Sequence, residues 1–312
     1  MVNHAPSPST PSSPRLVGID WGTSNRRAYL VDAAGACLAA HADGEGMLAA
    51  RPGFAASLAG LLARMDGGTG VSVVAAGMIG SAQGWREVPY LDTDVPLDAL
   101  PDHLYRVDDP AAGRPVWIVP GYAQRGLEVD VMRGEETQLL GALALGRRDG
   151  WFVLPGTHSK WVRLEDGVIR RIATFMTGEL FATLAAHGTL APLMADGDAG
   201  ADHDEAFADG LDAARRGAPL SHALFGARAR VVTGAMPAAH TRAWVSGLLI
   251  GAEFVAARAW TGDAGTLVCI GADALRGRYA RAARHFGVGF DALDPDRVFC
   301  AALARFIDRI PA

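Results

Sequence analysis

The sequence predicts two similar α/β domains, and three observations lead to this prediction. The chain has 312 residues, which corresponds to about two domains at ~150 residues each. A strand–turn–strand unit occurs twice, at a constant spacing that aligns Gly22 with Gly156 and Thr23 with Thr157. Each unit leads into a segment whose apolar residues recur at helical spacing.

The first unit reads as a β-meander. Residues 16–20 form a short apolar run that ends in Asp20, and the turn 21–25 follows. Apolar runs at 28–31 and 36–40 are separated by a second turn, and the helical pattern covers residues 53–65.

The second unit repeats this order. Apolar residues 151–154 precede the turn 155–160, further strands are expected at 161–164 and 168–172, and a helix is expected at 179–187. A charged, glycine-containing stretch at 147–150 suits a boundary. We therefore expect a disordered Pro/Ser-rich tail at residues 1–14 and domains at residues 15–148 and 149–312.

Composition excludes several classes of protein. The net charge of −5 argues against a nucleic-acid binder, and Cys37, Cys269 and Cys300 form neither a disulfide framework nor a zinc motif. No apolar run reaches the ~18 residues of a membrane span, and the N-terminus lacks the apolar core of a signal peptide. We expect a cytoplasmic protein. Its oligomeric state is left open, with a homodimer as one option.

The two Gly-Thr turns have a physical use. Glycine lets the backbone approach a phosphate, the turn amides point outward, and hydroxyl groups add donors. Two such turns facing each other across a cleft could hold a polyphosphate, and Asp20 could hold Mg²⁺ through water. Neither a P-loop nor a G-x-G-x-x-G fingerprint occurs.

Three motifs resemble those of the actin/hexokinase/heat-shock ATPase superfamily. Residues 20–25 resemble its first phosphate motif, 156–159 its second, and 267–279 its adenosine motif. This resemblance implies two ribonuclease-H-like domains flanking a nucleotide cleft. The nucleotide-binding residues that it implies are Gly22, Thr23, Ser24, Asn25, Gly156, Thr157, His158, Ser159, Gly271 and Ala272. Lys160 is the one lysine among 29 basic residues; it is either a point charge beside the phosphates or a solvent-facing residue.

Longer segments resemble the 2-dehydro-3-deoxygalactonokinase family. They are residues 19–28, 76–85, 131–138, 154–161, 176–180 and 246–253. The resemblance implies ATP- and Mg²⁺-dependent phosphorylation of 2-dehydro-3-deoxy-D-galactonate to its 6-phosphate, a step of galactonate catabolism.

Sugar kinases of this superfamily use a carboxylate near a helix start of the first domain as the base. Glu135 and Glu136 fit that placement, and we slightly prefer Glu136. Because helix N-termini favour negative charge, either residue could instead only cap its helix. Asp130 is a weaker third candidate. Asp20 is the expected Mg²⁺-linked carboxylate.

The substrate loop should follow the apolar strand 71–75, because open α/β sheets bind ligands where parallel strands end. Gly80, Ser81 and Trp85 are therefore assigned to the substrate pocket, with a packed loop as the alternative. The sequence does not rank the arginines that could hold the substrate carboxylate, which are Arg26, Arg86 and Arg133; we include Arg26 in the predicted site.

Three alternatives stay open. The protein could phosphorylate another sugar or keto-deoxy sugar acid. It could be a non-catalytic sugar sensor, although such regulators carry a DNA-binding helix-turn-helix for which residues 1–14 are too short. It could also be the nucleotide domain of an assembly or chaperone protein, although the chain leaves little room for the inserted subdomains.

Overall fold

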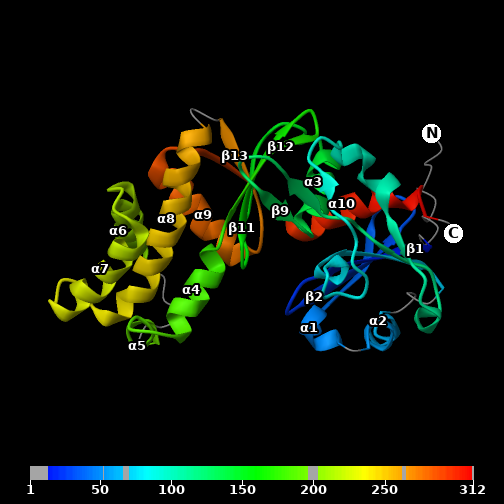
Figure 1. Ribbon diagram of the computed structural model, residues 1–312, viewed down its shortest axis with the longest axis horizontal. Helices are drawn as coiled ribbons and strands as arrows, with labels where there is room; N and C mark the ends of the chain where they lie inside the picture. The colour runs from blue at the N-terminus through cyan, green and yellow to red at the C-terminus, as the bar shows by residue number, and fades with distance from the viewer. Residues whose placement is uncertain (1–12, 52, 66–69, 196–202, 262–264, 311–312) are drawn as a thin grey trace, which may run out of the picture. The chain divides into compact units, whose positions relative to one another are not determined.

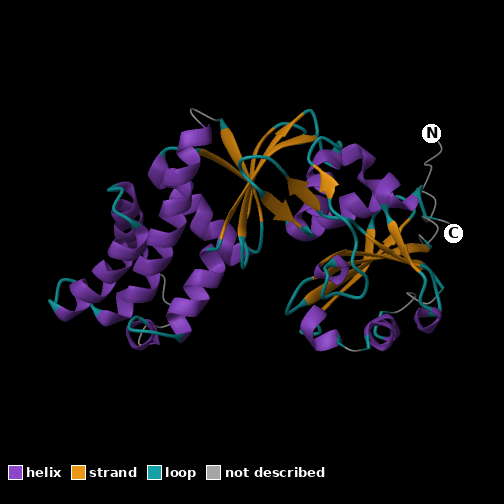
Figure 2. Cartoon of the chain, viewed as in Figure 1, coloured by secondary structure: helices purple, strands orange, loops and turns teal. Residues whose placement is uncertain are grey.

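The computed structural model describes residues 13–51, 53–65, 70–195, 203–261 and 265–310. It divides the chain into two compact units (Figures 1 and 2). Unit 1 comprises residues 1–123, 132–147 and 296–312, and unit 2 comprises residues 124–131 and 148–295. One division falls next to the expected boundary at 148. The expected C-terminal domain, 149–312, differs from unit 2 because its last helix belongs to unit 1. Of the expected tail, residues 1–12 lie outside the described part of the chain, and Pro14 already begins a strand.

Unit 1 is built on a six-stranded sheet in the order β3-β2-β1-β4-β7-β6. The first three strands form the predicted antiparallel meander, and β4 and β7 then join parallel to β1. The strands are β1 (Pro14–Trp21), β2 (Arg26–Asp32), β3 (Cys37–Asp43), β4 (Ser72–Gly77), β6 (Tyr105–Val107) and β7 (Val116–Ile118).

Helices cover both faces of this sheet. Val17, Ile19 and Trp21 point to one face and share a core cluster with α2. On the other face, a Cβ on Gly18 would lie 2.2 Å from the end of the Leu303 side chain, so α10 packs directly over this glycine. The helices of unit 1 are α1 (Met47–Ala50), α2 (Phe54–Ala63), α3 (Glu135–Ala144), α10 (Pro295–Ile307) and the 3₁₀ turns Met78–Gly80, Leu97–His103 and Pro110–Ala112. A small further sheet contains β5 (Leu91–Asp92), β8 (Tyr122–Gln124) and β9 (Asp130–Met132).

Unit 2 repeats the topology of unit 1. Its sheet has the order β12-β11-β10-β13-β14: three antiparallel strands, followed by two strands parallel to the first. The same order on both sides supports the duplication that the two Gly-Thr turns suggested. The strands are β10 (Gly150–Leu154), β11 (Ser159–Glu165), β12 (Val168–Phe175), β13 (Thr266–Ile270) and β14 (Gly289–Leu293).

The helices of unit 2 pack closely through glycines. A Cβ on Gly210 would lie 2.1 Å from the carbonyl oxygen of Trp244, and one on Gly247 would lie 2.1 Å from that of Phe207, so α6 and α8 touch through their backbones. The helices are α4 (Thr177–Ala186), α5 (Ala191–Ala195), α6 (Asp204–Arg215), α7 (Leu220–Val232), α8 (Thr241–Thr261), α9 (Asp273–Phe286) and the 3₁₀ turn Ala238–His240. Among the helices that could be described, none has the length and apolar character needed to cross a membrane.

Candidate active site

The first phosphate turn, residues 22–25, joins β1 to β2 and is held from behind. The carbonyl oxygens of Gly22, Thr23 and Ser24 accept the backbone N–H groups of residues 47, 48 and 46, at 2.8, 3.2 and 3.3 Å. In a trans peptide the C=O and the following N–H point in opposite directions. The amides of residues 23–25 are therefore turned away from this support, as a row of donors suited to an anion.

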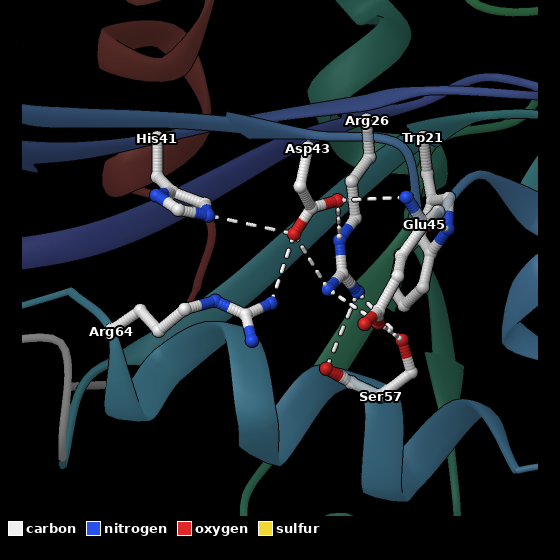
Figure 3. A network of polar contacts seen from close by, with 7 residues as sticks. All are labelled: Trp21, Arg26, His41, Asp43, Glu45, Ser57 and Arg64. Atoms are coloured by element: carbon white, nitrogen blue, oxygen red, sulfur yellow. Dashed lines mark hydrogen bonds and ion pairs between the residues drawn. The ribbon is translucent and has the colours of Figure 1, made fainter.

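Arg26 directly follows this turn and is held in a network of polar contacts (Figure 3). The residue is 1% exposed, and its guanidinium binds Asp43 at 2.9 and 3.0 Å, Glu45 at 2.9 Å and the Ser57 hydroxyl at 2.8 Å. Burial raises the pKa of Asp43, but the hydrogen bonds from Arg26 and neighbouring groups bring that pKa below its ordinary value. These contacts occupy Arg26, so it does not fit the substrate role expected from the sequence.

Asp20 lies at the end of β1, on the opposite face from the Ile19 and Trp21 side chains. It pairs in register with Ala76 of β4 and Arg27 of β2. Burial, with a smaller contribution from the charge of Glu135, raises the pKa of Asp20 to about 6, against the opposing effect of Arg27. The carboxyl groups of Asp20 and Glu135 therefore interact electrostatically.

Two glycines bring α3 to these strand ends. Gly77 and Gly134 have φ angles of +92° and +115°, which other residues rarely adopt. A Cβ on Gly134 would lie 3.3 Å from the Cα of Gly77, and one on Gly77 would lie 2.8 Å from the carbonyl oxygen of Trp21. The start of α3 thus reaches the ends of β4 and β1 through backbone contact.

Glu135 and Glu136 have different surroundings. Glu136 is 0% exposed, and its carboxyl group accepts the N–H of Gly134 at 2.7 Å and the hydroxyl of Thr137 at 3.2 Å. Burial, followed by the charge of Glu135, raises the pKa of Glu136 to about 8. Glu135 is half-buried and accepts the N–H of Arg133 at 3.0 Å. Both carboxyl groups accept a backbone N–H from two residues earlier, so exposure is what separates them: Glu135 is the more accessible acid, whereas the sequence slightly favoured Glu136.

The expected substrate loop follows β4, as predicted, but two of its side chains already have partners. The Ser81 hydroxyl donates to the carbonyl of Met78 at 2.7 Å. Trp85 donates to Asp109 at 3.1 Å and stacks on Phe54, with 6.1 Å between the ring centroids. Gly80 is buried against Arg133.

The second phosphate turn is exposed at residues 156–158 and rests on the start of α4. A Cβ on Gly178 would lie 2.2 Å from the carbonyl oxygen of Gly156, and the N–H of Glu179 donates to the Thr157 carbonyl at 2.9 Å. The His158 ring meets the Glu179 carboxylate at 2.6 Å.

Ser159 and Lys160 turn inward. Lys160 is 6% exposed and donates to the carbonyl of Val131 at 2.7 Å and to the hydroxyl of Thr174 at 2.9 Å. Asp130 accepts from the same hydroxyl at 2.5 Å. Lys160 therefore ties residues 124–131 to the sheet of unit 2, which differs from both roles expected for it.

Glu253 of α8 is a residue whose role sequence reasoning missed. Its buried carboxyl group accepts hydrogen bonds from Ser159 at 2.8 Å, Trp161 at 2.8 Å and Tyr279 at 2.7 Å. Burial raises its pKa, although these donors oppose the shift. A single acid within an otherwise apolar stretch was the available signal. Ser159 is thus part of the support of the turn.

A pocket of unit 2 lies next to the second turn. Gly156 and Gly178 line one part of it, Ser246 and Leu249 of α8 another, and Leu275 and Arg278 of α9 the rest. Gly271 and Ala272 form the junction from β13 to α9, where a Cβ on Gly271 would lie 3.0 Å from the Pro155 ring. The adenosine motif therefore packs against the strand that ends in the second turn.

Comparison with known proteins agrees with these motifs. The family model of 2-keto-3-deoxy-galactonokinase matches residues 20–306. A Rhizobium meliloti relative named as a 2-dehydro-3-deoxygalactonokinase is 39% identical over 290 residues, covering 92% of this chain and 94% of the relative. The Escherichia coli 2-dehydro-3-deoxygalactonokinase is 32% identical, covering 93% and 96%.

Solved structures agree as well. A crystal structure from Sinorhizobium meliloti that carries the same enzyme name has a TM-score of 0.86 and 38% identity, covering 93% of this chain and 97% of that one. Component A of the (R)-2-hydroxyglutaryl-CoA dehydratase from Acidaminococcus fermentans shares the fold alone, with a TM-score of 0.52, 10% identity and coverage of 95% and 97%. These likenesses and the repeated sheet order confirm the predicted actin/hexokinase-type fold. The chain belongs to the 2-keto-3-deoxy-galactonokinase family.

Proposed function

We propose that this protein transfers the γ-phosphoryl group of ATP to the terminal hydroxyl of 2-dehydro-3-deoxygalactonate, giving the 6-phosphate for galactonate catabolism in the cytoplasm. Family membership supports the substrate. The main support for phosphoryl transfer is the end of β1 in unit 1. There Asp20 precedes a turn whose amides point outward, and its carboxyl group interacts electrostatically with Glu135.

Each unit by itself offers groups suited to a nucleotide. In unit 1, the amides and side chains of residues 23–25 are suited to phosphate oxygens. In unit 2, the exposed residues 156–158 are suited to phosphate oxygens, and the pocket beside Ser246 and Arg278 is suited to the adenosine. Backbone amides suit this task because they are fixed before the ligand arrives.

Glu135 acts as the base. The substrate oxygen attacks the γ-phosphorus, the bond from that phosphorus to the ADP oxygen breaks, and the hydroxyl proton passes to the Glu135 carboxylate. Glu135 suits this role because it is half-buried, whereas Glu136 is fully enclosed.

Asp20 fits a Mg²⁺ ion held through water. Burial and the charge of Glu135 oppose its ionisation, and a nearby dication would relieve both effects. Bound Mg²⁺ neutralises phosphate charge in this class of reaction. No cluster of three or more His, Cys, Asp or Glu side chains suited to a metal occurs in the described ranges, so the proposed ion would be held mostly by water and phosphate.

The test is a coupled ADP-release assay over a panel of sugar acids and neutral sugars, with Mg²⁺ and with EDTA. We expect Mg²⁺-dependent turnover that is fastest with 2-dehydro-3-deoxygalactonate. Faster turnover of another sugar would overturn the substrate. Sugar binding without release of ADP on any member of the panel would point instead to a sensor.

A further inference from the structure

Arg133 is a buried arginine with unused hydrogen-bonding capacity. Arg133 lies between β9 and α3 in the sequence, and the residue is 9% exposed. One nitrogen, Nη2, donates to the carbonyl of Val88 at 2.7 Å, and the Tyr90 ring centroid lies 4.1 Å from the guanidinium carbon. Within the described ranges, the buried Nε and Nη1 atoms meet no acceptor.

Such a group is costly in a folded protein. Buried donors are nearly always paired, and a buried cation without an anion is more expensive still. Two contacts nevertheless hold this guanidinium in one orientation. The charge of Arg133 acts on the nearby Glu136, but no carboxylate in the described ranges is hydrogen-bonded to Nε or Nη1, so these two groups are suited to binding a further anion.

The neighbouring loop approaches this guanidinium through a glycine. A Cβ on Gly80 would lie 2.9 Å from Nη1 of Arg133 and 2.8 Å from Ile118. The N–H of Val88 donates to the carbonyl of Gly80 at 3.0 Å, which fixes the loop there. A side chain at position 80 would therefore press on Nη1 of the guanidinium.

The position along the chain relates Arg133 to the reaction. Its own N–H donates to the Glu135 carboxylate at 3.0 Å, so the base and the arginine are joined by one short segment. The other two candidate arginines are less suitable. Arg26 is fully engaged by acids, and Arg86 is exposed and contacts the Tyr105 hydroxyl at 3.3 Å.

We propose that Arg133 binds the carboxylate of the sugar acid through Nε and Nη1, beside the backbone of Gly80. This inference rests on the proposed function, because it assigns one end of that substrate. A planar guanidinium matches a carboxylate with two parallel hydrogen bonds, which a neutral sugar cannot replace. Arg133 would thus select acids over neutral sugars.

The test compares Arg133→Gln and Arg133→Lys with Arg106→Gln, an exposed arginine of unit 1, as the matched control. KM and kcat are measured for the sugar acid, for its C1 carboxamide and for ATP. We expect Arg133→Gln to raise KM for the acid by about 30-fold or more, with a smaller change for the carboxamide and little change for ATP. Arg133→Lys should recover part of the loss.

Thermal unfolding separates binding from a structural role. Arg133→Gln removes two unpaired donors but also the hydrogen bond to the Val88 carbonyl, so the two effects oppose each other and only a small change in melting temperature is expected. A lower melting temperature with equal losses on acid and carboxamide would overturn the proposal, as would a rise in KM for ATP alone. Calorimetry measures the affinity of the wild-type and variant proteins for the sugar acid without any turnover. It therefore tests the role of Arg133 in binding separately from the proposed kinase reaction. Arg133-dependent binding without turnover would sink only the kinase assignment.

Discussion

Arg26 and Asp43 form a two-point ion pair beneath the first phosphate turn, with Nε and Nη2 at 2.9 and 3.0 Å from the two carboxylate oxygens. Asp43 also contacts Arg64 at 2.9 Å, but that arginine is 44% exposed at its side chain, whereas Arg26 is 0% exposed. The two arginines therefore allow a matched comparison.

Arg26→Ala should destabilise unit 1 and weaken ATP binding. The change leaves Asp43 without its buried partner, and segment 43–48 then holds the turn carbonyls less firmly. The expected loss of unfolding free energy is about 3–5 kcal/mol, measured by denaturant unfolding together with KM for ATP. Arg64→Ala should cost at most ~1 kcal/mol because its ion pair is exposed. Equal losses in the two variants would contradict this account.

Asp20→Asn and Glu135→Gln should both lower kcat, but for different reasons. Glu135→Gln removes the proton acceptor, which should cost about 10²–10⁴-fold without changing the Mg²⁺ concentration that gives half-maximal rate. Asp20→Asn should raise that Mg²⁺ concentration. Steady-state kinetics over a Mg²⁺ titration distinguishes the two variants. The assignment fails if the Mg²⁺ requirement shifts in Glu135→Gln and stays constant in Asp20→Asn.

Glu136→Gln should keep activity within a few-fold and change how stability depends on pH. In the folded protein the pKa of Glu136 is raised from 4.5 to about 8, so folding favours the protonated acid. That contribution is fully present below about pH 4.5 and is lost as pH rises through about 8. Between pH 6 and 8, the free energy of unfolding should therefore fall less steeply in the variant than in the wild type. Identical slopes, or a kcat loss as large as that of Glu135→Gln, would refute this role.

Glu253→Gln should loosen the second phosphate turn from α8 and α9. The amide cannot accept all the hydrogen bonds that Ser159, Trp161 and Tyr279 donate, so a loss of about 1–3 kcal/mol is expected, with a higher KM for ATP. Glu165→Gln, which alters a half-exposed acid at the end of β11, is the control and should change little. The prediction is wrong if KM for ATP is the same in both variants.

Local pattern was enough to predict much of the fold. The apolar run of residues 16–20, the Gly-Thr turn and the glycine-containing turn at 32–35 indicated the first hairpins, and the same cues recur from Gly150 onward. These cues depend only on neighbouring residues, so they can be recognised in a single sequence. The family motifs extended the prediction to the repeated domain architecture.

Other features depend on contacts between distant segments, which local pattern does not reveal. Ser159 looked like a phosphate ligand because it lies in a turn motif, but Glu253, far along the chain, draws it inward. The sequence allowed Arg26 to bind the substrate carboxylate, but in the structure it is paired with Asp43 of β3. Likewise, contacts with distant residues such as Gly18 and Tyr29 show that α10 belongs to unit 1.

The contact between Gly18 and Leu303 has a consequence for biosynthesis. Residues 296–307 supply one covering helix of the sheet that begins at Pro14, and the chain of unit 2 lies between them. On the ribosome, this face of the sheet stays uncovered until nearly the whole protein has been made. Unit 2 can complete its fold earlier. A nascent chain stalled before Pro295 would expose apolar sheet surface to chaperones and proteases.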